Sequence, residues 1–174
     1  MNISEPEIIL IDNFIENSDV LFVVLRDNIV WDERIRARKT ASFGVSYDYS
    51  GITYPQIEMN SNLIPLCKTI ETEIGYLPNN CQLNYYPDGN STMGYHSDSA
   101  KELKSGTGVV IISLGSARYI SFRNKIDKEV KFKYKLSSGG LLYMDKLIQE
   151  KWMHAIPKQN NAGERISLTF RYIV

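Results

Sequence analysis

The sequence contains only two histidines, and one of them stands two residues before an aspartate in the stretch YHSD at 95–98. Residues i and i+2 of a β-strand point to the same face, so a strand here would let His96 and Asp98 reach one ion. The second histidine, His154, lies in the stretch KWMH at 151–154, which also has the character of a strand. Two imidazoles and one carboxylate facing a common point are the donor set of non-haem Fe(II) sites, which keep positions open for a co-substrate and O₂. The sequence therefore predicts an iron site at His96, Asp98 and His154.

The stretch RISLTFR at 165–171 alternates polar and apolar side chains without exception. On a surface strand its arginines, serine and threonine would simply meet solvent. Inside a barrel the same face would line a polar cavity, where arginine forks bind carboxylates bidentately and a small dicarboxylate would fit. Gln82, Asn84 and Tyr86 also share a strand face and could add an amide and a phenol to that cavity.

Most of the elements that would position these residues are short strands. Apolar or alternating stretches predict strands at 7–14, 81–86, 109–114, 118–123, 130–136, 141–144, 152–155 and 165–173, and two more that meet near Gly44 within 38–51. Helical spacing predicts one helix that begins at Ser18 or Asp19 and a second within 60–74 that ends at Gly75. The predicted fold class is mainly β with outer helices (α+β), built on a double-stranded β-helix (jelly-roll) core.

Composition limits the partners. The 174 residues, 43% of them hydrophobic, suffice for one packed domain. Twenty basic residues balance twenty acidic ones, so any polyanion must bind local basic patches, at 33–39 or 123–135. An alternative explanation of these patches is that they protect strand edges from pairing with other chains.

No apolar stretch approaches the roughly 20 residues of a membrane helix, and the start has no leader pattern. We therefore expect no membrane partner and a cytoplasmic protein (nuclear if eukaryotic), in which Cys67 and Cys81 are buried reduced thiols.

Taken together, the motifs resemble those of the AlkB family of Fe(II)- and 2-oxoglutarate-dependent dioxygenases. The resemblance rests on Asn84-x-Tyr86-x-Asp88-Gly89, Gly94-x-His96-x-Asp98, Ser113-Leu114-Gly115, Trp152-x-His154 and Arg165-x-x-x-Thr169-Phe170-Arg171. The aromatic stretch at 38–51 looks like the family's substrate lid. The resemblance implies a single domain over 1–174, with an N-terminal extension that carries the lid and helices (about 1–80) and a jelly-roll catalytic core (about 81–174).

The resemblance also implies a role for each motif. Catalysis would involve the iron ligands His96, Asp98 and His154 together with Arg171. The residues expected to bind 2-oxoglutarate are Asn84, Tyr86, Arg165, Ser167, Thr169 and Arg171. The residues expected to face the substrate are Tyr47, Tyr49, Ser99, Arg36 and Arg38. Arg165 and Arg171 would lie about 20 Å apart on a straight strand, so we expect Arg165 at the distal carboxylate and Arg171 nearer the metal.

The implied activity is oxidative N-demethylation of alkylated bases in DNA or RNA, such as 1-methyladenine and 3-methylcytosine. It would use Fe(II), 2-oxoglutarate and O₂ and release formaldehyde, succinate and CO₂. Because unstacking a base costs least where it is unpaired, the implied partner is single-stranded or locally unpaired alkylated nucleic acid, bound by a monomer. The sequence departs from the family's dealkylases at Ala100, where an acidic residue often meets the exocyclic amine, so the choice of base stays open. Two alternatives remain, a hydroxylase or demethylase of a protein or small molecule and a non-catalytic metal-binding jelly roll.

Overall fold

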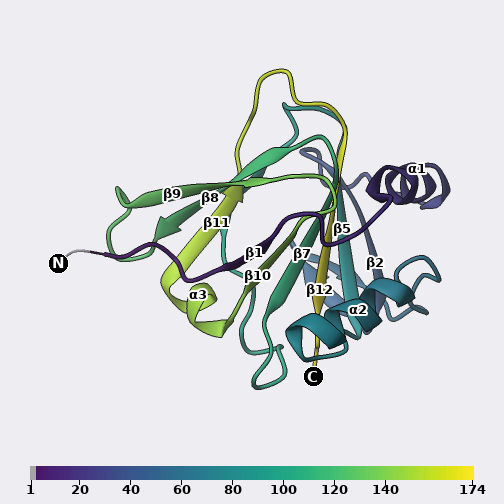
Figure 1. Cartoon of the computed structure of the whole chain (residues 1–174), viewed down its shortest axis with the longest axis horizontal. Coiled ribbons are helices and arrows are strands. Elements are labelled where there is room, and N and C mark those ends of the chain that lie inside the picture. The colour runs from purple at the N-terminus through teal and green to yellow at the C-terminus, as the bar shows by residue number, and fades with distance from the viewer. Residues whose placement is uncertain (1–2) are drawn as a thin grey trace.

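The chain folds around two antiparallel sheets that face each other (Figure 1). The computed structural model describes residues 3–174, so the first two residues of the domain expected over 1–174 lie outside it. The strands are β1 Ile9–Ile11, β2 Lys39–Gly44, β3 Tyr47–Tyr49, β4 Ile52–Tyr54, β5 Asn80–Tyr86, β6 Met93–His96, β7 Val109–Gly115, β8 Arg118–Asn124, β9 Lys131–Leu136, β10 Leu141–Met144, β11 Trp152–Ile156 and β12 Arg165–Arg171. The helices are α1 Ser18–Asn28, α2 Ile64–Ile74 and α3 Lys146–Lys151.

The strand order is that of a jelly roll. Over the described residues, a six-stranded sheet runs β1-β10-β7-β12-β5-β2 and a four-stranded sheet runs β6-β11-β8-β9, while β3 and β4 form a separate hairpin. From β5 to β12 the chain passes back and forth between the two sheets, and only β8 and β9 follow each other within one sheet. This confirms the predicted fold class. The large sheet extends beyond residues 81–174, because β1 and β2 form its two edges.

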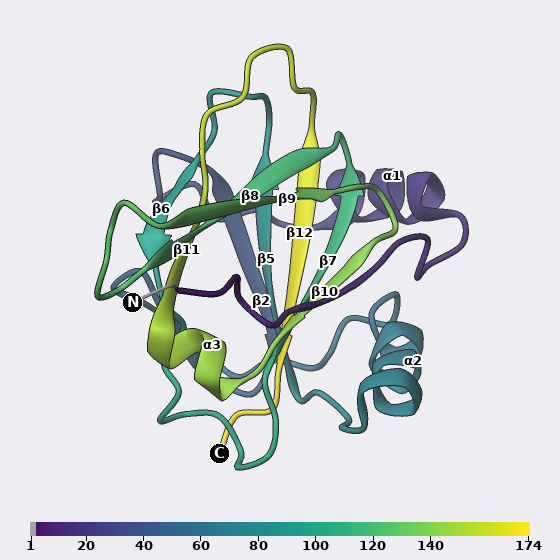
Figure 2. The same cartoon turned by 60° about the vertical axis from the view of Figure 1, so that its left-hand side comes forward.

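Each face of the large sheet has its own core. Ile166, Leu168 and Phe170 of β12 pack with residues of α1 and α2 on the outer face, and both helices lie on this side in two views (Figures 1 and 2). The inner face meets the small sheet through a second core that contains Phe122 and Trp152. All seven residues of β12 are buried, so its polar face cannot be the solvent-facing surface considered above. It faces the space between the sheets.

The predicted helices are confirmed, since α1 begins at Ser18 and α2 ends before Gly75, whose φ of 95° is the left-handed conformation that glycine adopts readily. Cys67 and Cys81 are buried and free, as expected. The sequence analysis missed β4 and α3. No helix within residues 3–174 is both long and apolar enough to cross a membrane.

Candidate active site

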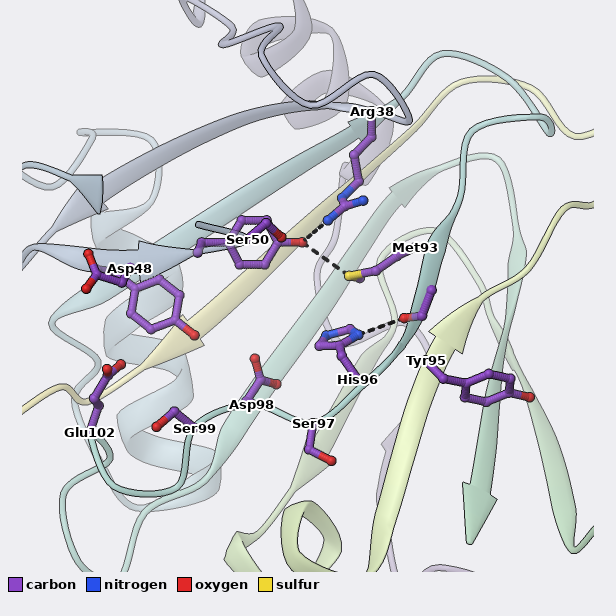
Figure 3. A pocket seen from close by; sticks show the side chains of 13 residues that line it. Arg38, Asp48, Ser50, Met93, Tyr95, His96, Ser97, Asp98, Ser99 and Glu102 are labelled. Carbon is purple, nitrogen blue, oxygen red and sulfur yellow. Dashed lines mark hydrogen bonds between the residues drawn. The ribbon is translucent and has the colours of Figure 1, made fainter. Parts of the chain in front are cut away.

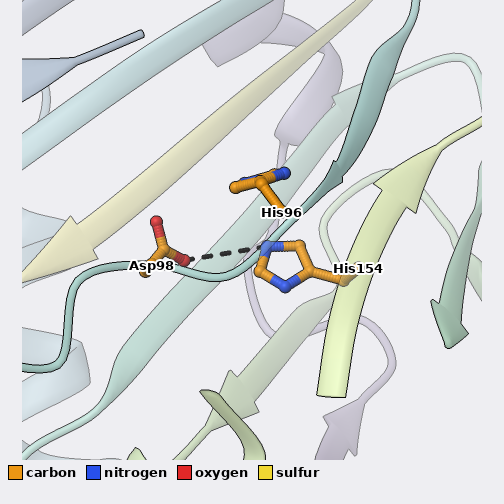
Figure 4. A group of neighbouring side chains, drawn as sticks. All are labelled: His96, Asp98 and His154. Atoms are coloured by element: carbon orange, nitrogen blue, oxygen red, sulfur yellow. Dashed lines mark ion pairs between the residues drawn. The ribbon is translucent and has the colours of Figure 1, made fainter. Parts of the chain in front are cut away.

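The predicted metal ligands come together on the inner side of the small sheet. His96 ends β6 and lies opposite His154 of β11, with 4.4 Å between the ring centroids. Asp98 completes the group, and the potential ligand atoms of the three residues all lie within 4.8 Å of one another (Figure 4). The arrangement can hold a metal ion on one side and leave the other side open to the pocket.

The sequence analysis expected strand alternation to bring Asp98 to this point. In the structure, Asp98 reaches it in another way. The strand ends at His96, and Asp98 lies in the irregular segment that follows. Nη2 of Arg171 donates to its Oδ1 at 2.6 Å, and its backbone N–H donates to Oε1 of Gln149 at 2.9 Å. The correct position of this carboxylate therefore depends on β12 and on α3, which carries Gln149.

The shifted pKa values of His154 and Asp98 give these two side chains the protonation states that metal binding requires. Burial lowers the pKa of His154 to about 3, so its imidazole is neutral at neutral pH. Burial alone would raise the pKa of Asp98, but the charge and hydrogen bond of Arg171 together with the two neighbouring histidines outweigh it, and the pKa falls to about 2. A 2.9 Å hydrogen bond joins Nδ1 of His96 to the carbonyl oxygen of Gly94. Because a carbonyl only accepts, Nδ1 of His96 carries a proton, and Nε2 is the ring nitrogen that can bind a metal.

A carboxylate oxygen of the cluster lacks a hydrogen-bond partner, as expected of a ligand to a divalent cation. Oδ2 of Asp98 is buried and has no hydrogen-bond partner among residues 3–174, although Nε2 of His154 is 3.7 Å away. Since that imidazole is neutral, it does not compensate the carboxylate. Buried polar atoms are nearly always satisfied, and Fe(II) is the metal that two imidazoles and one carboxylate typically hold with open positions.

Next to the metal cluster, β5 and β12 form a buried polar cradle. Their register pairs Arg165 with Tyr86 and Ser167 with Asn84, and Thr169 is buried on the same face of β12. Arg165 is fully buried, and its Nη2 donates to Oγ of Ser113 at 2.9 Å. No carboxylate pairs with it in the described part of the chain, and its Nε and Nη1 have no partner there.

A buried guanidinium without a counter-ion is costly, so the cradle fits an anionic guest. Arg165 lies at its far end, with Cζ 5.1 Å from the centroid of the Tyr86 ring. Arg171 lies at the metal end on Asp98, and its Nε and Nη1 lack partners among the described residues. A dicarboxylate such as 2-oxoglutarate can meet one arginine at each end.

Arg118 is a further buried arginine of this region that the sequence analysis did not single out. Its guanidinium lies 5.5 Å from the Tyr86 ring centroid and donates to the carbonyl oxygens of Asp88, Ser91 and Pro157 at 3.2, 2.9 and 2.7 Å. These carbonyls belong to the loop that leads into β6 and to the segment that follows β11. Arg118 thus ties together the two segments that carry the histidines.

A pocket of about 490 Å³ opens above the metal cluster (Figure 3). Its aromatic wall is formed by Tyr47 and Tyr49 of β3, whose ring centroids are 6.4 Å apart with 29° between the planes. Burial raises the pKa of each phenol to about 12, so both are neutral at neutral pH. The other lining residues are Arg38, Asp48, Ser50, Met93, Gly94, Tyr95, His96, Ser97, Asp98, Ser99 and Glu102. The predicted lid is therefore placed directly over the predicted metal site.

Of the two arginines expected to face the substrate, only Arg38 lines the pocket above the metal cluster. Arg38 is buried, and its guanidinium donates to Oδ1 of Asn84 at 3.0 Å and to the phenol of Tyr49 at 2.5 Å. It joins the lid to the cradle. Arg36 is exposed and lies in a turn at 35–38, outside the pocket. Both arginines border a second hollow, which Glu33 also lines.

The pocket also contains an acidic residue that sequence reasoning could not place. Ser99 lines the pocket as expected, and Glu102 reaches it as well (Figure 3). Glu102 would have pointed there on a continued strand, but the chain after His96 is irregular and brings it in by a loop. A carboxylate is therefore present at the pocket although Ala100 occupies the position where the sequence analysis looked for one.

Comparisons with known proteins agree with this geometry. The family model of the 2OG-Fe(II) oxygenase superfamily matches residues 24–171. The chain belongs to this superfamily. Uncharacterized protein R406 of Acanthamoeba polyphaga mimivirus is 32% identical over 155 residues, which cover 88% of this chain and 80% of that protein.

AlkB homologues are also among the relatives. Alpha-ketoglutarate-dependent dioxygenase alkB homolog 3 of Rattus norvegicus is 28% identical over 91% of this chain and 61% of that protein, and DNA oxidative demethylase ALKBH2 of Bos taurus is 29% identical over 79% of this chain and 53% of that protein. The chain thus spans between half and two thirds of these AlkB homologues. A solved structure titled "The structure of OsALKBH1" superposes with a TM-score of 0.65 at 16% identity and covers 98% of this chain, which supports the fold. The chain is therefore an oxygenase of the class that uses Fe(II), 2-oxoglutarate and O₂, and it is similar to AlkB homologues.

Proposed function

We propose that this enzyme removes N-alkyl groups from damaged bases of DNA or RNA, with 1-methyladenine and 3-methylcytosine as representative substrates. The observation that carries the proposal is the aromatic pocket above the metal cluster, in which Tyr47 and Tyr49 offer flat surfaces beside His96 and Asp98. Aromatic side chains bind unstacked bases by stacking. Relatives named as an alkB homolog 3 and a DNA oxidative demethylase point the same way.

The residues that would hold the reactants are those of the cluster and the cradle. His96, Asp98 and His154 would bind Fe(II), and Arg165 would bind the far carboxylate of 2-oxoglutarate. Bound iron would supply the oxidation of the N-methyl carbon, in which one oxygen atom of O₂ goes to that carbon and the other to the succinate that forms, with CO₂, from 2-oxoglutarate. The hydroxymethyl base then releases formaldehyde.

The residues of the chain position the reactants and shield them from water. Arg171 keeps the Asp98 carboxylate ionised and oriented by its 2.6 Å hydrogen bond. Arg38 connects the phenol of Tyr49 to Asn84, so the wall of the base pocket and the cradle hold each other in place. Apart from the metal ligand Asp98, Glu102 and Asp48 are the acidic groups of the pocket that could accept a hydrogen bond from the exocyclic amine of adenine or cytosine.

The base must leave its stack to enter such a pocket, and this costs least for a lesion that cannot pair. We therefore expect single-stranded or locally unpaired strands to react fastest. The test is incubation of the purified chain with Fe(II), ascorbate, 2-oxoglutarate and oligonucleotides that contain one methylated base, as DNA or RNA and as single or double strands. Formaldehyde and the restored base are the expected products. Succinate formation that needs a protein or a metabolite, with every oligonucleotide unchanged, would instead favour the hydroxylase alternative.

A further inference from the structure

The outer face of the small sheet carries a row of positive charge that the active site does not use. Lys131, Lys133 and Lys135 alternate along β9 and are exposed. In the β8–β9 register, Lys131 lies opposite Arg123 and Lys133 lies opposite Ser121. Opposed residues of antiparallel strands point to the same face, so the four cations share one surface. We call Arg123, Lys131, Lys133 and Lys135 the basic face.

This charge is not compensated within the protein. None of the four side chains takes part in an ion pair in the described part of the chain. Residues 123–135 contain six basic and two acidic residues, so the rest of this neutral chain carries 14 basic and 18 acidic residues. Protection of an edge strand explains lysines on β9. It does not explain Arg123 on the neighbouring inner strand or the separation of charge along the sequence.

Tyr95 connects the basic face with the substrate pocket. It borders the pocket, but its ring points to the other side of β6 from His96 (Figure 3). There Cζ of Arg123 lies 4.0 Å from the ring centroid, and a 2.6 Å hydrogen bond joins the phenol to Oγ of Ser121. Because β6 is the edge strand of the small sheet, a polymer that leaves the pocket can turn around this edge onto the basic face.

We infer that the basic face binds the phosphates of the single strand whose alkylated base occupies the pocket, an inference that rests on the proposed function. Alternate residues of a strand are about 7 Å apart, so Lys131 to Lys135 form a line of charge on the order of 14 Å, which suits a polymeric anion better than a single phosphate. Tyr119, which lies opposite Lys135 and is 43% exposed, and Tyr95 add rings on which neighbouring bases can stack. The recognised group is the phosphate, which DNA and RNA share.

The test is the salt dependence of strand binding. Fluorescence anisotropy would measure the Kd of unmodified oligothymidylate and oligouridylate of about 15 nucleotides, near the longest strand that one binding module covers, between about 50 and 200 mM salt. The variant Lys131→Gln with Lys133→Gln removes two charges from exposed side chains. Its matched control is Lys68→Gln with Lys146→Gln, which removes two exposed charges from α2 and α3.

Two lost phosphate contacts should raise the Kd for both strands and make the slope of log Kd against log salt shallower by about 1.4, while the control variant keeps the wild-type slope. An unchanged slope in the Lys131/Lys133 variant, or an equal change in both double variants, would overturn the inference. Turnover of a short methylated trinucleotide, too short to reach the basic face, should be equal in the three proteins. If the wild type did not turn over the trinucleotide, the proposed function would be contradicted. The slopes of the binding measurements would still decide whether the basic face binds the strand.

Discussion

Arg165 allows the binding of a dicarboxylate to be tested without any turnover. The change is Arg165→Met, which keeps most of the side-chain length and removes a fully buried charge. At 2-oxoglutarate concentrations of about 100 times Kd, the ligand adds about 2.7 kcal/mol to the free energy of unfolding of the wild type. Loss of one partner of a buried charge pair weakens binding by about 2 to 5 kcal/mol. The same concentration of 2-oxoglutarate should therefore add about 0.9 kcal/mol or less to the free energy of unfolding of the variant.

The same substitution should not destabilise the ligand-free protein. Burial lowers the pKa of the Arg165 guanidinium, which reflects the cost of a charge that no carboxylate within residues 3–174 compensates. The assay is urea unfolding followed by tryptophan fluorescence, with Mn(II) in place of iron and with or without 2-oxoglutarate. Arg34→Met, on an exposed side chain, is the control and should keep the full ligand effect. If 2-oxoglutarate stabilised Arg165→Met as much as the wild type, the assignment of the cradle would be refuted.

Three further outcomes follow from the structure. Tyr49→Ala should weaken binding of a methylated strand by about 1 to 3 kcal/mol because it removes a stacking surface. Tyr49→Phe keeps the ring, loses only the hydrogen bonds of the phenol to Arg38 and Met93, and should weaken binding less; equal losses in the two variants would contradict stacking. Arg118→Met removes the donor to the part-buried carbonyls of Ser91 and Pro157 and one of two donors to the carbonyl of Asp88. It should lower the free energy of unfolding by about 2 kcal/mol, as measured by urea denaturation; no decrease would mean that water replaces the guanidinium. Burial raises the pKa of Cys67 to about 11 and that of Cys81 well above its usual range, so at pH 8 only about one Cys67 in a thousand is a thiolate. Iodoacetamide should therefore label neither thiol before unfolding and both after it; the protection of Cys67 should fade as the pH rises toward 11.

Strand alternation made the cofactor motif visible in the sequence and drew attention to His96 and Asp98, although Asp98 lies beyond the end of its strand. The pattern of RISLTFR places two arginines on one face whatever surrounds the strand, and the packing of α1 and α2 on the other face then decides that the polar face is internal. The spacing of the two histidines could not show that they lie opposite each other. That is a property of the β6–β11 register, which depends on the whole two-sheet topology.

The residues that were missed or misplaced depend on irregular or very short segments. α3 has six residues, too few for a helical period to be recognised, and it supplies the Gln149 that holds Asp98. Glu102 reaches the pocket through a loop, which no periodic pattern describes. Arg38 belongs to the charged run at 33–39 and was also expected to face the substrate, and its buried position beside Tyr49 makes it part of the pocket wall.

The most direct test of the account is the fate of a single methyl group. A single-stranded oligonucleotide with one 1-methyladenine or 3-methylcytosine, incubated with the enzyme, Fe(II), ascorbate and 2-oxoglutarate, should lose the mass of one CH₂ and release one formaldehyde per strand. Asp98→Ala, which removes the carboxylate whose Oδ2 is unsatisfied among the described residues, should leave the strand unchanged. If the wild-type enzyme left the mass of the methylated oligonucleotide unchanged for both bases, in DNA and in RNA, the proposed demethylation would be contradicted.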